Sequence, residues 1–179
     1  MVRLFGGWDL GSGLCDDPNM IGEADRSGVP MGSSLPARRS GSPTFLVSAL
    51  RDPGTQARRG TPLQRLQVIK GWIEAGEAHQ RVFDVAGNAG DGASVDESCV
   101  QRGPGFDSLC AEWTDPDFNP SQHAFYYARV LENPSCRWSA YDCNSLPPAE
   151  QPVSCADPEV PRVLQERAWT SPIWYEPQR

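Results

Sequence analysis

"AFYYARVLE", residues 124–132, is the most ordered-looking segment of the chain. Because successive side chains of a strand point to opposite faces, Phe125, Tyr127 and Arg129 lie on one face of the predicted strand and the residues between them lie on the other. Aromatic and β-branched residues favour strands over helices. The segment therefore predicts a β-strand, and the fold class depends on how many other segments resemble it.

Three segments on the amino-terminal side extend this pattern. Residues 45–50 form an apolar run bounded by prolines and a Pro-Gly turn, as a central strand does. Residues 62–74 admit a strand or a short helix, and their β-branched side chains favour the strand. Residues 79–87 alternate again and follow a Gly-containing turn, so we predict that they form its hairpin partner.

The remainder of the chain predicts short elements joined by long connections. Val2 and Leu4 alternate with Arg3 as in a strand, which we expect to end in a turn at Gly6-Gly7, and a second short strand ends at Trp113. Residues 19–26 are the one place where a short helix is expected. Two polar stretches, residues 86–108 and 133–161, are predicted to be loops.

The composition agrees with a β-rich protein. A chain of 179 residues is long enough to bury the core of one domain, and its 17 Gly and 17 Pro suit many strands and turns better than a helical bundle. We therefore predict a single β-rich domain over residues 1–179. Its expected class is mainly β, a β-sandwich-like accessory domain with long Gly- and Pro-rich loops and at most short helices.

The charge and the hydropathy exclude some partners. A formal net charge of −7 argues against binding to nucleic acid or to an anionic membrane. No apolar run approaches the roughly 18 residues of a membrane helix, and no apolar leader follows Met1. An even number of cysteines, six in all, favours an oxidising compartment, so a periplasmic or secreted location is expected although no signal peptide is visible.

The cysteines suggest disulfides rather than a zinc site, because none of them forms a CxxC pair. Cys99 and Cys110 enclose a short loop whose centre, Gly103 to Gly105, can turn the backbone back on itself, so we predict that these two cysteines pair. The other cysteines, which are also candidates for bridges, are Cys15, Cys136, Cys143 and Cys155. A second bridge is expected among the last three, with the pair left open.

The closing stretch "QERAWTSPIWY", residues 165–175, admits two interpretations. Its aromatic and β-branched residues favour a strand, but its proline excludes the middle of a central one. We therefore expect a structural edge strand that closes the sandwich, with Trp169 and Ile173 buried and with Trp174 and Tyr175 as further structural residues. The alternative is an aromatic ligand platform.

The residues that could support catalysis or metal binding do not form a complete set. Asp115, Asp117 and Asn119 alternate like the start of an EF-hand loop, but a proline and a tyrosine replace the glycine and the glutamate that this loop needs. We therefore expect a turn at this segment. His79 and His123 are predicted to be surface histidines. The sequence predicts no catalytic residue, no metal ligand and no cofactor within this chain.

Six blocks of the chain resemble a known family in the family's order. This is the domain-of-unknown-function family 3604 (DUF3604), bacterial proteins that resemble metal-dependent hydrolases of the polymerase-and-histidinol-phosphatase (PHP) type. The blocks are VRLFGGWDL (2–10), GVPMGSSLP (28–36), PTFLVSALRDPG (43–54), TPLQRLQVIKGW (61–72), AFYYARVLENPSCRWSAYDC (124–143) and QERAWTSPIWY (165–175). The resemblance implies that the chain corresponds to the family's carboxyl-terminal part. The barrel in which family members would hold a divalent metal lies outside it.

The resemblance and the residues together leave three functions open. The first is a non-catalytic structural or interaction domain whose partner is a PHP-like barrel or a second copy of itself. The second is an accessory part of a hydrolase active site, which residues 86–121 would complete. The third is a carbohydrate- or ligand-binding sandwich that uses exposed Trp8, Trp138 or Trp174. We expect the first, and the solvent exposure of the three indoles separates it from the third.

Overall fold

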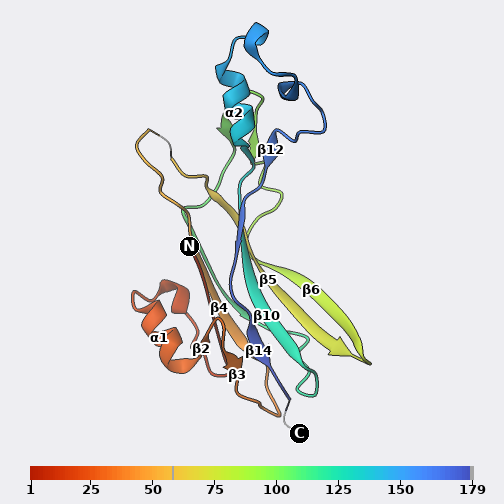
Figure 1. The fold of residues 1–179 in the computed structure, drawn as a ribbon. Helices are drawn as coiled ribbons and strands as arrows, with labels where there is room; N and C mark the ends of the chain where they lie inside the picture. Colours follow the sequence, from red (N-terminus) through yellow and green to blue (C-terminus); the bar gives the residue numbers. More distant parts are fainter. Residues whose placement is uncertain (58, 178–179) are drawn as a thin grey trace.

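The computed structural model describes residues 1–57 and 59–177. Two β-sheets pack against each other to form an elongated body, and a smaller distal lobe extends from one end of it (Figure 1). The smaller sheet has the strand order β2-β1-β4-β9, and the larger sheet has the order β3-β14-β10-β5-β6 with β13 also paired to β10. The predicted mainly β, sandwich-like class is therefore confirmed.

The predicted strands correspond to long strands of the two sheets. The smaller sheet contains β1 (Val2–Gly7), β2 (Val29–Pro30), β4 (Thr44–Leu50) and β9 (Ser108–Thr114). The larger sheet contains β3 (Ser34–Leu35), β5 (Leu63–Glu74), β6 (Glu77–Gly87), β10 (Ala124–Glu132), β13 (Arg167–Trp169) and β14 (Ile173–Tyr175). Strands β5 and β6 form the predicted hairpin, whose two-residue turn has positive φ at Ala75 and Gly76, as a type I′ turn requires.

The main core lies between the two sheets. Leu4 and Phe45 of the smaller sheet meet Val68, Tyr126 and Ala128 of the larger sheet, and all five side chains are buried. The rings of Phe45 and Tyr126 are 4.3 Å apart between centroids. The even-numbered residues of β10 face this core, as their alternation predicted, so its odd-numbered residues face away from it.

A buried ion pair lies at one end of this core. Lys70 Nζ is 2.6 Å from Asp115 Oδ2 and donates to the backbone oxygen of Asp117 at 2.8 Å. The Tyr126 hydroxyl donates to the same Asp115 oxygen at 2.7 Å. Burial and the Asp115 carboxylate raise the pKa of Tyr126, so this hydroxyl stays a donor. Asp115, whose position in the sequence resembled that of a calcium ligand, thus accepts hydrogen bonds within the core.

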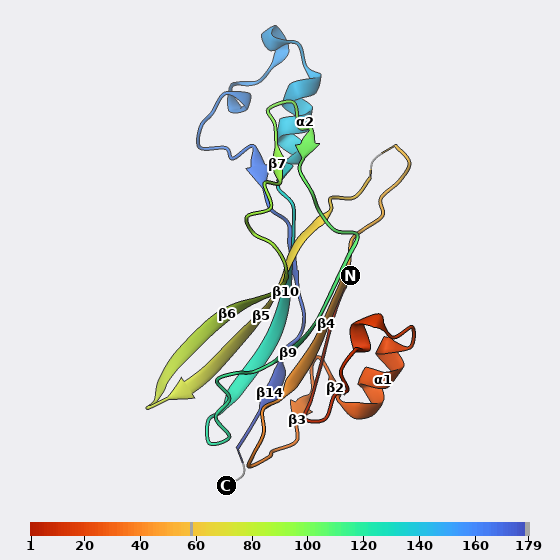
Figure 2. The ribbon, with the colours of Figure 1, turned by 180° about the vertical axis from the view of Figure 1, so that it is seen from behind.

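Helix α1 (Met20–Ser27) and the short helix η1 (Leu14–Asp16) cover the outer face of the smaller sheet (Figures 1 and 2). Phe5 and Leu46 of this sheet form a second apolar cluster with Leu14 and Ala24. A disulfide between Cys15 of η1 and Cys110 of β9 fixes the layer covalently. No helix among the described residues is long and apolar enough to cross a membrane.

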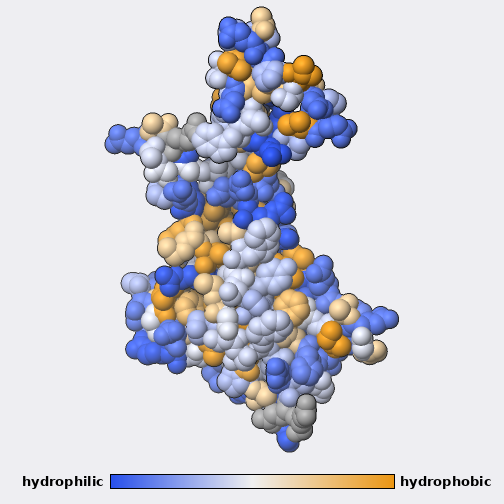
Figure 3. Space-filling view, in the orientation of Figure 1, coloured by the Kyte–Doolittle hydropathy of each residue, from blue (hydrophilic) through white to orange (hydrophobic). Residues whose placement is uncertain are grey.

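The distal lobe lies beyond a narrow waist of the molecule (Figure 3). It contains β7 (Ser94–Val95), β8 (Gln101–Arg102), β11 (Ser135–Cys136), α2 (Trp138–Ser145), η2 (Pro148–Glu150), η3 (Val153–Cys155) and β12 (Val163–Leu164). Two disulfides, Cys99–Cys136 and Cys143–Cys155, join its segments. The predicted loop over residues 133–161 therefore includes a helix, α2.

The predicted pairing of Cys99 with Cys110 is wrong. Cys110 lies in the middle of β9, opposite Ser48 of β4, and bonds to Cys15 across the helical layer. Cys99 lies in the distal lobe and bonds to Cys136. The chain between Cys99 and Cys110 does not close a loop, because it runs from the lobe into the body. The expected second bridge among the last three cysteines is confirmed as Cys143–Cys155.

The prediction for the closing strand is partly wrong. Strand β14 is not at an edge, because it lies between β10 and β3. Ile173 is buried, as expected, and Tyr175 is buried as well. Trp169, which was expected to be buried, is 54% exposed, and Trp174 is 47% exposed. The proline of this stretch lies in the gap between β13 and β14, so it interrupts no pairing within either strand.

Candidate ligand-binding surface

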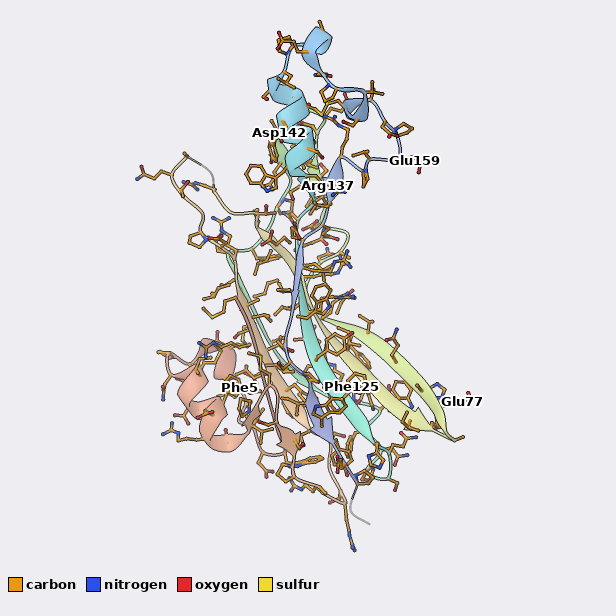
Figure 4. The ribbon with its side chains drawn as sticks, in the orientation of Figure 1. Phe5, Glu77, Phe125, Arg137, Asp142 and Glu159 are labelled. Atoms are coloured by element: carbon orange, nitrogen blue, oxygen red, sulfur yellow. A yellow bond between two sulfur atoms is a disulfide. The ribbon has the colours of Figure 1, made fainter. Side chains whose placement is uncertain are left out.

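The outer face of the larger sheet lacks the helical layer that covers the smaller sheet. Among the described residues, α1 lies on the smaller sheet and α2 lies in the distal lobe (Figure 1). Phe125, Tyr127 and Arg129, which face outward from β10, are therefore only half-buried. Phe125, labelled in Figure 4, lies on this face between β14 and β5.

The first row of side chains across this face combines aromatic rings with an amide. Trp174 of β14 is opposite Phe125, Phe125 is opposite Gly71 of β5, and Gly71 is opposite Gln80 of β6. The Trp174 and Phe125 rings are 5.3 Å apart between centroids. A Cβ atom at Gly71 would lie 2.3 Å from Cζ of Phe125, so only glycine allows this ring to lie flat across β5.

The second row continues the aromatic surface. Tyr127 is opposite Ile69, which is opposite Val82. The Tyr127 ring is almost parallel to the Phe125 ring, with an interplanar angle of 11° and a centroid separation of 6.3 Å. Ile69 is buried beneath the outward side chains, and Val82 is exposed at the margin. The rings thus lie along β10 on an apolar base.

The third row contains a hydrogen-bonded polar group. Trp169 of β13 is opposite Arg129, and the row continues through Gln67 to Asp84. Arg129 Nε donates to Gln67 Oε1 at 2.7 Å, and Gln67 Nε2 donates to Asp84 Oδ1 at 2.6 Å. These bonds hold three polar side chains in fixed positions beside the Trp169 ring.

Four rings therefore lie along this face, and we call them the aromatic strip: Trp174, Phe125 and Tyr127, which follow one another in ring contact, and Trp169, which lies in the next row opposite Arg129. The three rows are two residues apart along β10, so the strip is about 14 Å long. Figure 3 views the molecule from this side, and pale and orange atoms cover the centre of the face while blue atoms lie at its margins. Side chains that can form hydrogen bonds border the rings at both ends of the strip.

A groove of about 710 Å³ lies at the Trp174 end of the strip. Trp174 and Phe125 form its aromatic side, and Ile73 adds apolar surface. His123 and Glu176 provide hydrogen-bonding groups. The groove is open to solvent along the sheet, so a ligand could lie in it and continue along the strip.

A second hollow of about 490 Å³ adjoins the groove and shares His123 and Glu176 with it. Its other side includes Arg38 and Arg39. Arg38 is paired with Asp9 at 3.2 Å, whereas Arg39 forms no ion pair with any residue that the structure describes.

Tyr175 holds together the two loops that line this hollow. Its hydroxyl lies 2.9 Å from the backbone oxygen of Pro120 and 3.2 Å from that of Arg38, so it links the two loops that border the hollow. Burial raises the pKa of Tyr175, so the hydroxyl remains protonated as a donor. Tyr175 thus has the structural role that the sequence predicted for it.

The other tryptophans and histidines considered as candidates lie in different parts of the molecule. Trp8 is partly buried against the core and donates from Nε1 to the Pro36 oxygen at 2.8 Å, whereas Trp138 is 68% exposed on the distal lobe. His79 stacks on Trp72, and His123, which is exposed, borders the groove. Within residues 1–57 and 59–177, no group of three or more His, Cys, Asp or Glu side chains is arranged to hold a metal ion.

The turn predicted at residues 115–121 is confirmed. Asp115 Oδ1 accepts the backbone N–H of Asp117, and Asn119 Oδ1 accepts that of Ser121, both at 2.9 Å. The Asp117 carboxylate pairs with Arg81 on β6. These oxygens serve the local backbone and a surface ion pair, so they do not converge as the ligands of a calcium loop do.

Comparison with known proteins identifies the family. A search of curated proteins and a search of solved structures each found no match. A family model described as "Protein of unknown function (DUF3604)" matches residues 1–177. This match covers essentially the whole chain and agrees with the resemblance seen in its six blocks. The chain therefore belongs to the DUF3604 family.

Proposed function

We propose that this chain is a non-catalytic binding domain that recognises a saccharide through the aromatic strip. The observation that carries the proposal is the exposure of Trp169 and Trp174, at opposite ends of a row of rings on a sheet face that none of the described helices covers. Large exposed apolar patches with a polar rim mark binding sites on soluble proteins.

The chemistry of the strip suits sugars. One face of a pyranose ring presents C–H groups that pack on an aromatic ring, and its edge presents hydroxyls that need donors and acceptors. The strip offers both, because its rings are bordered by the Asp84–Gln67–Arg129 group at one end and by His123 and Glu176 at the other. A single-stranded nucleic acid would also stack on aromatic rings, but the net charge of −7 opposes it.

The proposal is tested by titrating the intact chain with a panel of neutral and charged oligosaccharides, followed by tryptophan fluorescence. We expect at least one of them to shift the emission, because the indoles at the ends of the strip would lose contact with water. Trp174→Ala should abolish the response, whereas Trp138→Ala, on the distal lobe, should keep it. A panel without any binding oligosaccharide would refute the proposal, as would a Trp174→Ala variant that binds like the parent.

The runner-up function is docking to another protein domain, such as the PHP-like barrel that the resemblance implies. The composition of the strip favours it too, because interface cores are rich in Trp, Tyr, Phe and Arg and poor in other charged residues. Mixing the chain with the barrel of a full-length relative and measuring co-elution distinguishes the two functions. Docking through the strip would be lost in a Trp169→Ser/Trp174→Ser variant and kept in Trp138→Ser.

In either function the domain binds a ligand or a partner and does not itself catalyse a reaction. The possibility that residues 86–121 complete a hydrolase site is the weaker alternative. Phe106 of this range pairs with Leu63 within the body, and Cys99 is held in the distal lobe by its disulfide. Assaying the barrel with and without the chain on a generic phosphoester separates this alternative, because a shared active site requires both parts for turnover.

A further inference from the structure

The charges around the aromatic strip differ from those of the chain as a whole. The chain has a formal net charge of −7. Three arginines nevertheless lie beside the strip or line the hollow that adjoins its groove: Arg39, Arg129 and Arg167. Within the part of the chain that the structure describes, none of the three forms an ion pair with a carboxylate.

The three guanidinium groups are distributed along the strip. Arg129 lies in the third row opposite Trp169, and its Nε donates to a neutral amide, that of Gln67. Arg167 is exposed two residues before Trp169 on β13, so it projects on the same face. Arg39 lies at the opposite end, where its hollow adjoins the groove beside Trp174.

From this arrangement we infer that the ligand of the strip is an acidic saccharide chain, with its sugar rings on the aromatic residues and its anionic groups at Arg39, Arg129 and Arg167. The inference rests on the proposed saccharide binding and adds the ligand's charge. Guanidinium groups form strong, often bidentate hydrogen bonds with carboxylate and with sulfate-like oxyanions. Both groups occur on sugars, and the strip recognises the chemistry that they share.

The length of the strip favours a chain over a single sugar. Cations at its two ends are separated by about 14 Å of aromatic surface, estimated from the strand rise. One sugar ring is shorter than the strip, whereas a chain of several rings can cover its whole length. The groove is open, so the chain can continue beyond it. An internal stretch of a polysaccharide therefore fits better than a chain end held in a closed pocket.

Asp84 and Glu176, which lie beside the strip and in its groove, do not reverse this preference. Asp84 accepts from Gln67 and lies 3.7 Å from Arg65, so a neighbouring cation offsets its charge. Glu176 borders the groove, where sugar hydroxyls can donate to it. The uncompensated charges of this face are then mainly positive, and they complement an anionic chain.

The test compares three tetrasaccharides by calorimetric titration of the intact chain: an oligouronate, the same compound with its carboxyl groups reduced to alcohols, and a sulfated oligosaccharide. We expect the oligouronate, the sulfated compound or both to bind at least about tenfold more tightly than the neutral compound at low salt. The difference should shrink at high salt, because salt screens exposed charges.

Variants assign the preference to the arginines. An Arg39→Gln/Arg167→Gln variant should lose about tenfold in affinity for the acidic ligand and little for the neutral one. Arg129→Lys should keep part of the preference, because the charge remains. The matched control is Arg137→Gln, an exposed arginine of the distal lobe that is labelled in Figure 4; it should bind like the parent.

The possible outcomes separate this inference from the proposed function. Equal binding of the acidic and the neutral tetrasaccharides would overturn the inference and leave saccharide binding intact. Acidic preference that survives the double arginine variant would overturn it as well. If none of the three compounds binds and the broader panel also fails, both the inference and the proposed function are wrong.

Discussion

Asp115 and Lys70 are the charged residues on which the interior of the body depends most. The Asp115 side chain is fully buried, the Lys70 side chain is 5% exposed, and each has the other as its counter-ion. Removing both charges from water is costly, and their mutual attraction compensates only while the pair is complete. The Tyr126 hydroxyl, which donates to Asp115, needs the same oxygen.

Asp115→Ala is therefore expected to destabilise the chain by about 3–5 kcal/mol, because it leaves the Lys70 charge buried without a counter-ion. Urea denaturation measures the loss. The control is Asp117→Ala two residues away, which breaks a surface pair with Arg81 and should cost about 0–1 kcal/mol. Similar losses from the two substitutions would contradict the role assigned to the buried pair.

Trp169 and Ile173 have opposite environments although they lie in the same closing stretch. Trp169→Ala should change the free energy of unfolding by only about 0.5 kcal/mol, because the indole is mostly exposed. Ile173→Ala should cost about 2–5 kcal/mol, because this side chain is fully buried in the core. Thermal denaturation of both variants tests the pair, and a Trp169→Ala chain that fails to fold would argue that the strip is structural.

Glu132 predicts a dependence of stability on pH. Burial raises its pKa, and the nearby carboxylates of Glu166 and Asp52 raise it further. Between the unfolded value, about 4.3, and the raised folded value, the folded state binds more protons than the unfolded state, so stability falls as pH rises through this window.

Glu132→Gln should therefore stabilise the chain at pH 7, and this gain should disappear below about pH 4, where both forms of the parent are protonated. Urea denaturation of parent and variant over a pH series provides the measurement. Glu77→Gln, at the exposed first residue of β6, serves as the control and should show no comparable gain. A constant difference between parent and Glu132→Gln at all pH values would show that ionisation is not the cause.

At the scale of elements, the Cys15–Cys110 disulfide connects the helical layer to the edge strand of the smaller sheet. It joins residues 95 positions apart, so it restricts the unfolded chain strongly. The double substitution Cys15→Ser/Cys110→Ser should cost about 4–5 kcal/mol by the chain-entropy relation. The corresponding Cys143→Ser/Cys155→Ser variant removes a bridge between residues 12 positions apart and should cost about 3 kcal/mol.

Guanidinium denaturation of the two double variants tests this ranking. A larger loss from the short bridge than from the long one would show that strain or local packing, rather than loop closure, determines what each disulfide contributes. Reduction of the parent chain should lower its free energy of unfolding through the loss of all three disulfides, because Cys99–Cys136 is also opened under these conditions.

The long strands could be predicted from the sequence, because each of them follows from the pattern of its own residues. The alternation of residues 124–132, the apolar run of residues 45–50 and the hairpin over residues 62–87 all specify strands, whatever their partners. The partner of Cys110 and the place of β14 within its sheet depend on contacts between distant parts of the chain. Spacing along the sequence carries no information about those contacts, which is why both predictions failed.

The candidate surface could be predicted only in part for a related reason. Alternation assigned Phe125, Tyr127 and Arg129 to one face, and this is correct. Whether that face is buried depends on what covers the sheet, and the short helix predicted near residue 20 could have packed on either sheet. A signal was nevertheless present, because both faces of β10 carry aromatic residues while only one can meet the core.

At the scale of the whole molecule, the body and the distal lobe differ in how they are stabilised. The body has an apolar core between two sheets. The lobe has a small cluster that includes Cys99, Cys136 and Ala140, and it relies on two disulfides. Small regions with few buried apolar residues open more readily than a sheet core, so the two parts should differ in local stability.

Cys99→Ser/Cys136→Ser should therefore loosen the lobe without loosening the aromatic strip. Amide hydrogen exchange should become faster in α2 and β12, while β5 and β10 keep the protection of the parent, because their pairing does not involve the lobe. Saccharide binding followed by tryptophan fluorescence should be retained. Loss of protection in β5 and β10 to the same extent as in α2 would mean that the lobe and the body unfold as one unit. The strip would then depend on a disulfide at the far end of the molecule.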